Sequence, residues 1–286
     1  MLEPIILDTD GSLDFFRRDI KRIYLRDLQA SLQYWADQEA IRRFQAKLLQ
    51  EASPAGFCRF LGSGDFHHLT LATLEKLTDP FALLVFDNHP DCSYALPRYA
   101  CGNWLYHAVK LPLCRQVVHV GATETYGWLR RALSLHSLQQ SGKLLFIPAE
   151  IGKGKKYYCQ EIMTLLEPSL KEEMPLYLSL DKDVINAQES PGDWDNGILT
   201  LTDVVYLIEA VGSSFSYIGA DITGEASFPC NYQGYFLKHL LADWDHPNPC
   251  DKLSLTASWQ KQEKVNTILL SLLAKGADGD TAGGNE

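Results

Sequence analysis

Short runs of apolar residues alternate along the chain with longer segments in which apolar residues recur every three or four positions. The short runs are typical of buried strands. They lie at residues 5–7, 58–61, 81–86, 117–120, 144–147, 176–180 and 217–220. Amphipathic helices are predicted at residues 68–77, 126–140, 158–167 and 202–211, the last starting with a cap at Thr202 and Asp203. This alternation predicts an α/β fold in which crossover helices join parallel strands.

The two ends of the chain follow other patterns. From about residue 12 to residue 51, apolar side chains such as Phe16, Ile20 and Leu28 lie mostly three or four apart with many charges between them. This region is expected to form one or two long amphipathic helices. A further helix is expected over residues 259–275, and the small polar residues 276–286 are expected to be disordered. We find no internal repeat or linker and predict a single domain over residues 1–275.

Composition and charge narrow the class of partner. Of the 286 residues 46% are hydrophobic, which is enough for a sizeable core. The formal net charge of -10 argues against nucleic acid or an anionic membrane as a partner, because both would need a basic face. A small cationic molecule is favoured instead.

The cysteines and the N-terminus bear on location. Seven cysteines form an odd set without a Cys-x-x-Cys pair, which predicts reduced thiols and cytoplasmic residence. The N-terminus has no basic region followed by an apolar one, and no apolar run approaches the length of a membrane span. We therefore expect no membrane association.

Potential metal ligands follow three of the predicted strands. Asp87, His89 and Asp91 come directly after the run at 81–86, and Asp181 and Asp183 come directly after the run at 176–180. Side chains two apart in an extended chain point the same way, so each set can converge on one point. A third segment, residues 62–68, adds imidazole groups after another strand. In open parallel sheets, ligands bind beyond the carboxyl ends of the strands.

Together these residues predict two divalent cations. A single aspartate at a strand end is more often a helix cap or a turn residue than a ligand, but capping rarely explains three such segments at once. Converging carboxylates repel one another unless cations neutralise them. Four carboxylates and two or three histidines without cysteine suit hard or borderline ions better than structural zinc, and Mn²⁺ is our first choice.

At these motifs the chain resembles the arginase, agmatinase and formiminoglutamase (ureohydrolase) superfamily. Residues 87–91, Asp-Asn-His-Pro-Asp, resemble the family's Asp-x-His-x-Asp, and residues 179–183, Ser-Leu-Asp-Lys-Asp, its Ser-x-Asp-x-Asp. Residues 62–73 resemble its Gly-Gly-Asp-His motif. Residues 191–192 and 197–200 resemble its Pro-Gly-Gly-Leu-Thr, split here by residues 193–196. The resemblance implies a three-layer αβα sandwich with a mostly parallel sheet of about eight strands.

The resemblance also implies how two Mn²⁺ ions would be held. One ion would take His67, Asp87, Asp91 and Asp181, and the other His89, Asp87, Asp181 and Asp183, with a hydroxide bridging the pair. Because the first motif carries an extra residue, His67 is assigned through the residues that follow it. His68 is the alternative ligand.

Further residues are candidates for catalysis and substrate binding. Two cations lower the pKa of a bridging water, and Asp91 would orient the resulting hydroxide. His107 lies where the family places its proton-transfer histidine, and its alternative is a core histidine. Glu225 would hold a guanidinium group, although the family's Asp-x-x-Glu is one residue longer here and an ordinary loop carboxylate is the alternative. Glu124 is a further substrate candidate or else a helix cap.

These features predict a hydrolase of a linear C–N bond outside peptides, in a guanidino or formimino compound. A deacetylase-like amide hydrolase is the second reading, and a metal-stabilised protein without catalysis is the third. Complete sets of ligands for two ions speak against the deacetylase. The family implies a homo-oligomer, without fixing the number of subunits.

Overall fold

The computed structural model describes residues 2–93, 97–122, 139–140, 142–151, 155–156, 159–170, 174–226, 233–242 and 252–275. At its centre lies an eight-stranded sheet with the order β2-β1-β4-β12-β11-β5-β7-β8, in which neighbouring strands pair in parallel. The strands are β1 (Glu3–Asp8), β2 (Lys21–Tyr24), β4 (Phe57–Ser63), β5 (Phe81–Phe86), β7 (Cys114–Gly121), β8 (Leu144–Pro148), β11 (Leu176–Asp181) and β12 (Tyr217–Glu225). The predicted parallel sheet is confirmed.

Helices and two minor strand pairs complete the described elements. The α-helices are α1 (Gln29–Leu32), α2 (Gln38–Glu51), α3 (Leu69–Leu74), α4 (Trp104–Ala108), α6 (Cys159–Ser169), α7 (Leu201–Gly212), α8 (Tyr235–Ala242) and α9 (Lys252–Lys275). The 3-10 helices are η1 (Arg26–Leu28), η2 (Gly64–Phe66), η3 (Cys101–Asn103) and η4 (Lys182–Val184). Antiparallel pairs join β3 (Trp35–Ala36) to β6 (Tyr99–Ala100) and β9 (Glu150–Ile151) to β10 (Lys155–Lys156).

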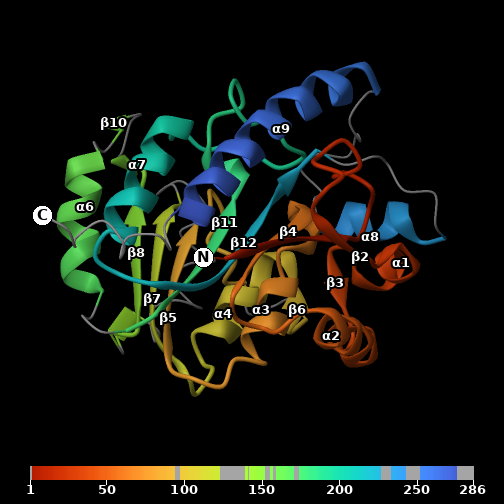
Figure 1. The fold of residues 1–286 in the computed structure, drawn as a ribbon, viewed down its shortest axis with the longest axis horizontal. Helices are drawn as coiled ribbons and strands as arrows, with labels where there is room; N and C mark the ends of the chain where they lie inside the picture. The colour runs from red at the N-terminus through yellow and green to blue at the C-terminus, as the bar shows by residue number, and fades with distance from the viewer. Residues whose placement is uncertain are drawn as a thin grey trace, which may run out of the picture.

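Two apolar cores lie on the two faces of the sheet, because successive side chains of a strand point to opposite faces. In β5, Leu84 and Phe86 belong to the core shared with α6, α7 and α9, whereas Leu83 and Val85 belong to the core shared with α1 to α4. Figure 1 shows these two groups of helices on either side of the strands. Both faces of the strand are therefore apolar, as in other parallel sheets, and the three-layer αβα sandwich is confirmed.

The N-terminal region differs from the long helices expected over residues 12–51. Residues 12–37 form turns, β2, η1, α1 and β3, and the only long helix described in this region is α2. The segment with Ile23 is helix-like in its spacing, but it pairs in parallel with β1 and buries Ile23 as a strand. Apolar spacing alone does not distinguish a short edge strand from part of a helix.

Helix starts also depend on contacts that spacing does not reveal. The N-cap of α7 is Thr200 rather than Thr202, because the side chains of Thr200 and Asp203 form a capping box. Helix α9 begins at Lys252, earlier than the expected residue 259. Residues 126–138 of a predicted helix and the predicted tail 276–286 lie outside the described residues. Within the described ranges, no helix has the length and apolar character needed to cross a membrane.

Candidate metal centre

The carboxyl ends of β4, β5 and β11 bring the three ligand segments together. Leu180 of β11 pairs with Phe86 of β5, so Asp181 at the end of β11 lies beside Asp87 directly after β5. Strand β4 continues through η2 to His67. All three segments therefore lie at the edge of the sheet where open parallel folds bind their ligands.

His67 faces three carboxylates. Its Nδ1 lies 3.3 Å from Asp87 Oδ2, 3.3 Å from Asp91 Oδ2 and 3.5 Å from Asp181 Oδ2. Ligand atoms of His67, Asp87 and Asp91 all lie within 4.8 Å of one another, close enough to hold one metal ion. The structure thus brings together the residues predicted for the first ion.

A second group shares Asp87 with the first. Nδ1 of His89 lies 2.6 Å from Asp183 Oδ2 and 3.6 Å from Asp87 Oδ1, and ligand atoms of these three residues also lie within 4.8 Å of one another. One oxygen of Asp87 therefore faces His67 and the other faces His89. A carboxylate with this orientation can bridge two cations.

The carboxylate ligands are buried and their ionisation is strongly shifted. Burial, with repulsion from Asp183 and Asp87, raises the pKa of Asp181 well above its ordinary value. Burial likewise raises the pKa of Asp183 to about 6 and that of Asp91 to about 7. Such a cluster relieves its repulsion either by taking up protons or by binding cations.

Two histidines bring positive charge to the carboxylate cluster. Burial lowers the pKa of His67, but its close contacts with the Asp87 and Asp91 carboxylates outweigh burial and leave the pKa well above the ordinary value. Asp183 has the same effect on the pKa of His89. Each imidazole therefore sits where a cation is electrostatically favoured.

Neighbouring groups orient the ligands. The Nε2 of His67 lies 2.9 Å from Ser179 Oγ, which leaves Nδ1 to face the carboxylates. Trp104 Nε1 donates a 2.6 Å hydrogen bond to Asp91 Oδ2. Such outer contacts fix ring orientation and ligand direction in metal sites.

Asp91 has a strained backbone. Its φ is 43°, in the left-handed region that residues other than glycine rarely adopt. The amide of Leu105 donates a 3.1 Å hydrogen bond to the Asp91 carbonyl and holds it in place. Left-handed backbone is costly and is often found at functional sites, where it sets the direction of a side chain.

Two glycines allow close packing around Asp181. Gly224 has φ 92°, and a Cβ at this position would lie 2.4 Å from Asp181 Oδ1. A Cβ at Gly64 would lie 3.2 Å from Asp181 Oδ2 and 2.8 Å from Trp194 Cδ1. Side chains at either position would compete with the Asp181 carboxylate for space.

His68, the alternative ligand, lies away from the cluster. Its side chain is fully buried, and neither ring nitrogen makes a hydrogen bond of normal geometry. Burial, with the nearby Lys238 and His67, lowers its pKa to about 3. Of the two histidines, His67 is the one that faces the carboxylates.

Comparison with known proteins shows the family. The family model described as the arginase family matches residues 7–226, which include all six predicted ligands. The chain belongs to the arginase family. The predicted resemblance to this family is confirmed.

Individual relatives of the arginase family are distant in sequence. An uncharacterized protein of Thermotoga maritima is 30% identical over 214 residues, which are 75% of this chain but only 66% of that protein. The arginase of Bacillus caldovelox matches with a TM-score of 0.55 at 16% identity, covering 94% of this chain and 98% of that one. An agmatine ureohydrolase of Thermoplasma volcanium matches with a TM-score of 0.55 at 14% identity, covering 98% and 92%. The two structures support the fold.

Among the catalytic candidates taken from the arginase family, His107 contacts other residues than the metal ligands. Within the described chain, its ring nitrogens lie 3.3 Å from Arg98 Nη1 and 3.2 Å from Asn103 Nδ2, and its ring lies against Tyr106. Burial, with the positive charges of Arg98 and Lys110, lowers its pKa to about 4. The proton-transfer role of His107 stays a prediction.

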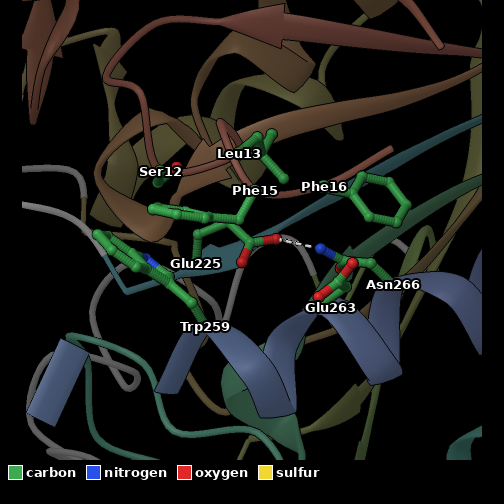
Figure 2. Close-up of a pocket in the computed structure, with 8 residues that line it drawn as sticks. All are labelled: Ser12, Leu13, Phe15, Phe16, Glu225, Trp259, Glu263 and Asn266. Carbon is green, nitrogen blue, oxygen red and sulfur yellow. Dashed lines mark hydrogen bonds between the residues drawn. The ribbon is translucent and has the colours of Figure 1, made fainter. Parts of the chain in front are cut away.

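Glu225 is buried in a different environment from the cluster. Its Oε1 forms an ion pair with Lys182 and accepts a 2.7 Å hydrogen bond from Asn266 Nδ2. Figure 2 shows Glu225 in a pocket beside Asn266 of α9, with the stacked rings of Phe15 and Trp259 on one side. Glu225 thus already has a cationic partner, which bears on its predicted role in holding a guanidinium group. Glu124, the other candidate, lies outside the described residues.

Two residues near the ligands were not predicted from the sequence. Trp194 Nε1 donates a 3.0 Å hydrogen bond to Asp65 Oδ1, and its ring lies edge-on to that of His89 with centroids 5.8 Å apart. Burial raises the pKa of Asp65 to about 8. The sequence did carry a signal for Trp194: residues 193–196 interrupt the Pro-Gly-Gly-Leu-Thr motif, so this chain differs from the family at that point.

Proposed function

We propose that this protein is a binuclear metal hydrolase that cleaves a C–N bond of a guanidino or formimino compound. The observation that carries the proposal is Asp87, which belongs to both groups of potential ligands and directs one oxygen to each. Membership of the arginase family supports the same reading. His67, Asp87, Asp91 and Asp181 would hold one ion, and His89, Asp87, Asp181 and Asp183 the other.

The donor set fits two divalent ions. Asp87 Oδ2 is buried and makes no hydrogen bond of normal geometry, although it lies 3.3 Å from His67 Nδ1. An orphaned buried carboxylate oxygen is costly unless a cation satisfies it. Aspartate oxygens and imidazole nitrogens suit Mn²⁺, which we propose as the metal.

The protein would contribute orientation and exclusion of water. When bound, two divalent ions lower the pKa of a shared water toward neutrality and supply hydroxide as the nucleophile. Asp91, held by Trp104 and by its left-handed backbone, would accept a hydrogen bond from that nucleophile. The side chains of His67, Asp87, Asp91, Asp181 and Asp183 are at most 9% exposed, so the attack on a planar C–N carbon would take place largely away from bulk solvent. His107 remains the proposed proton donor to the leaving amine.

Two ligand groups that share Asp87 favour this proposal over a deacetylase-like site with one ion and fewer ligands. A small cationic substrate agrees with the net charge of -10. Cytoplasmic residence, a single domain over residues 1–275 and assembly of identical subunits stay predictions.

The test is a product assay on purified protein loaded with Mn²⁺. The substrates are arginine, agmatine, guanidinobutyrate, formiminoglutamate, guanidine and acetylated polyamines. We expect urea or formamide from at least one guanidino or formimino compound, and no product from the Asp183→Ala variant. Acetate from the polyamines would support the deacetylase instead. The proposal fails if protein that holds two ions releases no product from any compound.

A further inference from the structure

The segment that interrupts the family motif, residues 193–196, contacts all three ligand segments together with Gly197, which directly follows it. Asn88 Nδ2, between two ligands, donates a 2.8 Å hydrogen bond to the Asp195 carbonyl. The Gly197 amide donates a 2.6 Å hydrogen bond to the carbonyl of Asp183. Trp194 reaches Asp65, two residues before His67. Because these contacts come from separate loops, the segment is held across the metal centre.

Trp194 stands at the part of the centre that is most open to solvent. The side chain of His89 is 15% exposed, whereas those of the other five predicted ligands are 9% exposed or less. The half-buried Trp194 ring lies edge-on to the His89 ring, at an angle of 74° between the planes. A substrate that reaches the ions past His89 would therefore meet the indole of Trp194.

Gly64 brings the indole close to the carboxylates. A Cβ on Gly64 would lie 2.8 Å from Trp194 Cδ1 and 3.2 Å from Asp181 Oδ2. The indole and a predicted ligand of both ions thus both lie close to the position that a side chain at residue 64 would occupy. The hydrogen bond to Asp65 holds the indole in this position.

Glu225, which is predicted to bind the cationic group of the substrate, already has a cationic partner in this chain. Lys182 is fully buried and forms an ion pair with Glu225, so the carboxylate is neutralised before any substrate binds. An aromatic ring face can attract a planar cation without a carboxylate, and tryptophan is the best of the aromatic residues for this contact.

We propose that Trp194 is the specificity-determining wall of the substrate pocket, on which a planar guanidinium or amidinium group stacks. This inference rests on the proposed function, since it assigns the substrate's cationic group to the same centre. Trp194 contacts the bound group and leaves the cleavage chemistry to the residues around the ions.

The experiment measures binding of guanidinium chloride, at millimolar concentration, to the Mn²⁺-loaded protein by calorimetry. Urea serves as an uncharged probe of the same shape. Trp194→Phe keeps an aromatic face, whereas Trp194→Leu removes it and keeps an apolar side chain. Trp35→Phe, in β3, is the matched control for changing a tryptophan elsewhere. Metal content is measured on every variant.

We expect Trp194→Leu to raise the Kd for guanidinium by about two- to thirtyfold, the range typical of cation–π contacts, with a smaller effect on urea. Trp194→Phe should stay within about threefold of the wild type because phenylalanine keeps a weaker ring face. Trp35→Phe should bind guanidinium as the wild type does. All variants should retain the wild-type metal content.

Three results would overturn the inference. The first is that the wild type does not bind guanidinium, and the second is that Trp194→Leu binds it as tightly as the wild type does. The third is loss of metal from both Trp194 variants, which would show that Trp194 supports the ligand loops. The proposed function fails separately: if no compound is hydrolysed but guanidinium binding follows the expected order, Trp194 is still the recognition wall. If substrates are hydrolysed and Trp194→Leu leaves both KM and guanidinium binding unchanged, the recognition role of Trp194 is refuted and the proposed function stands.

Discussion

At the scale of single residues, the two oxygens of Asp87 have different neighbours. Oδ2 lies 3.3 Å from His67 Nδ1, and Oδ1 lies 3.6 Å from His89 Nδ1 and accepts a 2.6 Å hydrogen bond from the His89 amide. Asp183 contacts only the second of these imidazoles among the described interactions. The two carboxylates should therefore differ in how many ions depend on them.

We predict that Asp87→Ala abolishes binding of both ions, whereas Asp183→Ala weakens one ion and retains the other. The physical reason is that each ion loses a shared anionic ligand in the first variant. Metal content after desalting, measured by mass spectrometry, gives the stoichiometry. Asp79→Ala, which removes an exposed carboxylate, is the control. Wild-type stoichiometry in Asp87→Ala would refute the assignment of the bridging ligand.

The two adjacent histidines provide a second test at this scale. We predict that His67→Phe loses metal, whereas His68→Leu keeps two ions. His68→Leu should change the free energy of unfolding by less than about 1.5 kcal/mol, because it replaces a buried ring without normal hydrogen bonds by an apolar side chain. Urea unfolding and metal analysis measure both effects. If His68→Leu lost an ion while His67→Phe kept both, the two histidines would have to exchange roles.

At the scale of elements, the ends of β11 and β12 are packed without spare space. Asp181 ends β11, and Gly224 in β12 lies against it with a left-handed backbone. The next residue, Glu225, points toward α9 because strand side chains alternate, and there it pairs with Lys182. The segment that carries Asp181 and Asp183 is thus held by packing against β12 and by the ion pair between Lys182 and Glu225.

Gly224→Ala is expected to displace the Asp181 carboxylate and reduce metal affinity, since the new Cβ would lie 2.4 Å from Asp181 Oδ1. Gly56→Ala is a matched control with φ 84° and no atom within 4 Å of its Cβ, so it isolates the cost of the backbone conformation. That conformational cost is about 1–2 kcal/mol. Metal titrations and unfolding curves separate the two effects, and equal metal affinity in both variants would contradict this account.

Lys182→Met is expected to destabilise the fold by about 3–5 kcal/mol, because it leaves the Glu225 carboxylate buried without a counter-charge. Adding Glu225→Gln should restore much of that loss, since a neutral amide needs no cation. Urea unfolding of the single and double variants measures the coupling. A double variant no more stable than Lys182→Met would show that the pair is not what holds the segment.

At the scale of the whole molecule, protons and metal ions compete for the same buried groups. Burial raises the pKa of Asp183 to about 6 and that of Asp91 to about 7 in the ion-free protein. The pKa values of His67 and His89 also lie well above their ordinary value, held there by the carboxylates. Each of these groups therefore holds its proton to higher pH in the folded than in the unfolded chain.

The sign of the pH dependence follows from this difference. Between about pH 5 and pH 8 the folded ion-free protein binds more protons than the unfolded chain, so its stability should fall as the pH rises. Affinity for Mn²⁺ should rise over the same range, with proton release on binding, because the ion replaces protons. Thermal unfolding with and without chelator, and calorimetry in two buffers, measure these effects. An Mn²⁺ affinity independent of pH would contradict the assignment of these groups as ligands.

Much of the architecture follows from sequence because its cause is local. All residues of β5 are apolar and buried, and such a run bounded by polar residues is a strand of a parallel sheet covered on both faces. The sequence also indicated that Asp87, His89 and Asp91 lie together, but the expected reason, alternation along an extended strand, was wrong. Strand β5 ends at Phe86 and Asp91 has φ 43°, so these residues meet through a loop. The short β2 was missed because four residues with one buried side chain, Ile23, form a strand only when β1 is alongside.

The chain by itself determined the α/β class and the family and predicted the ligand residues, because apolar periodicity and motif spacing are properties of neighbouring residues. Only the tertiary structure decided that one oxygen of Asp87 faces each imidazole, that Glu225 pairs with Lys182, and that Trp194 stands beside His89. The residues in each of these contacts come from separate strands and loops, so their distances depend on the order of strands in the sheet. The physical reason is that coordination and ion pairing act over a few ångströms in space, whereas sequence patterns record only separation along the chain.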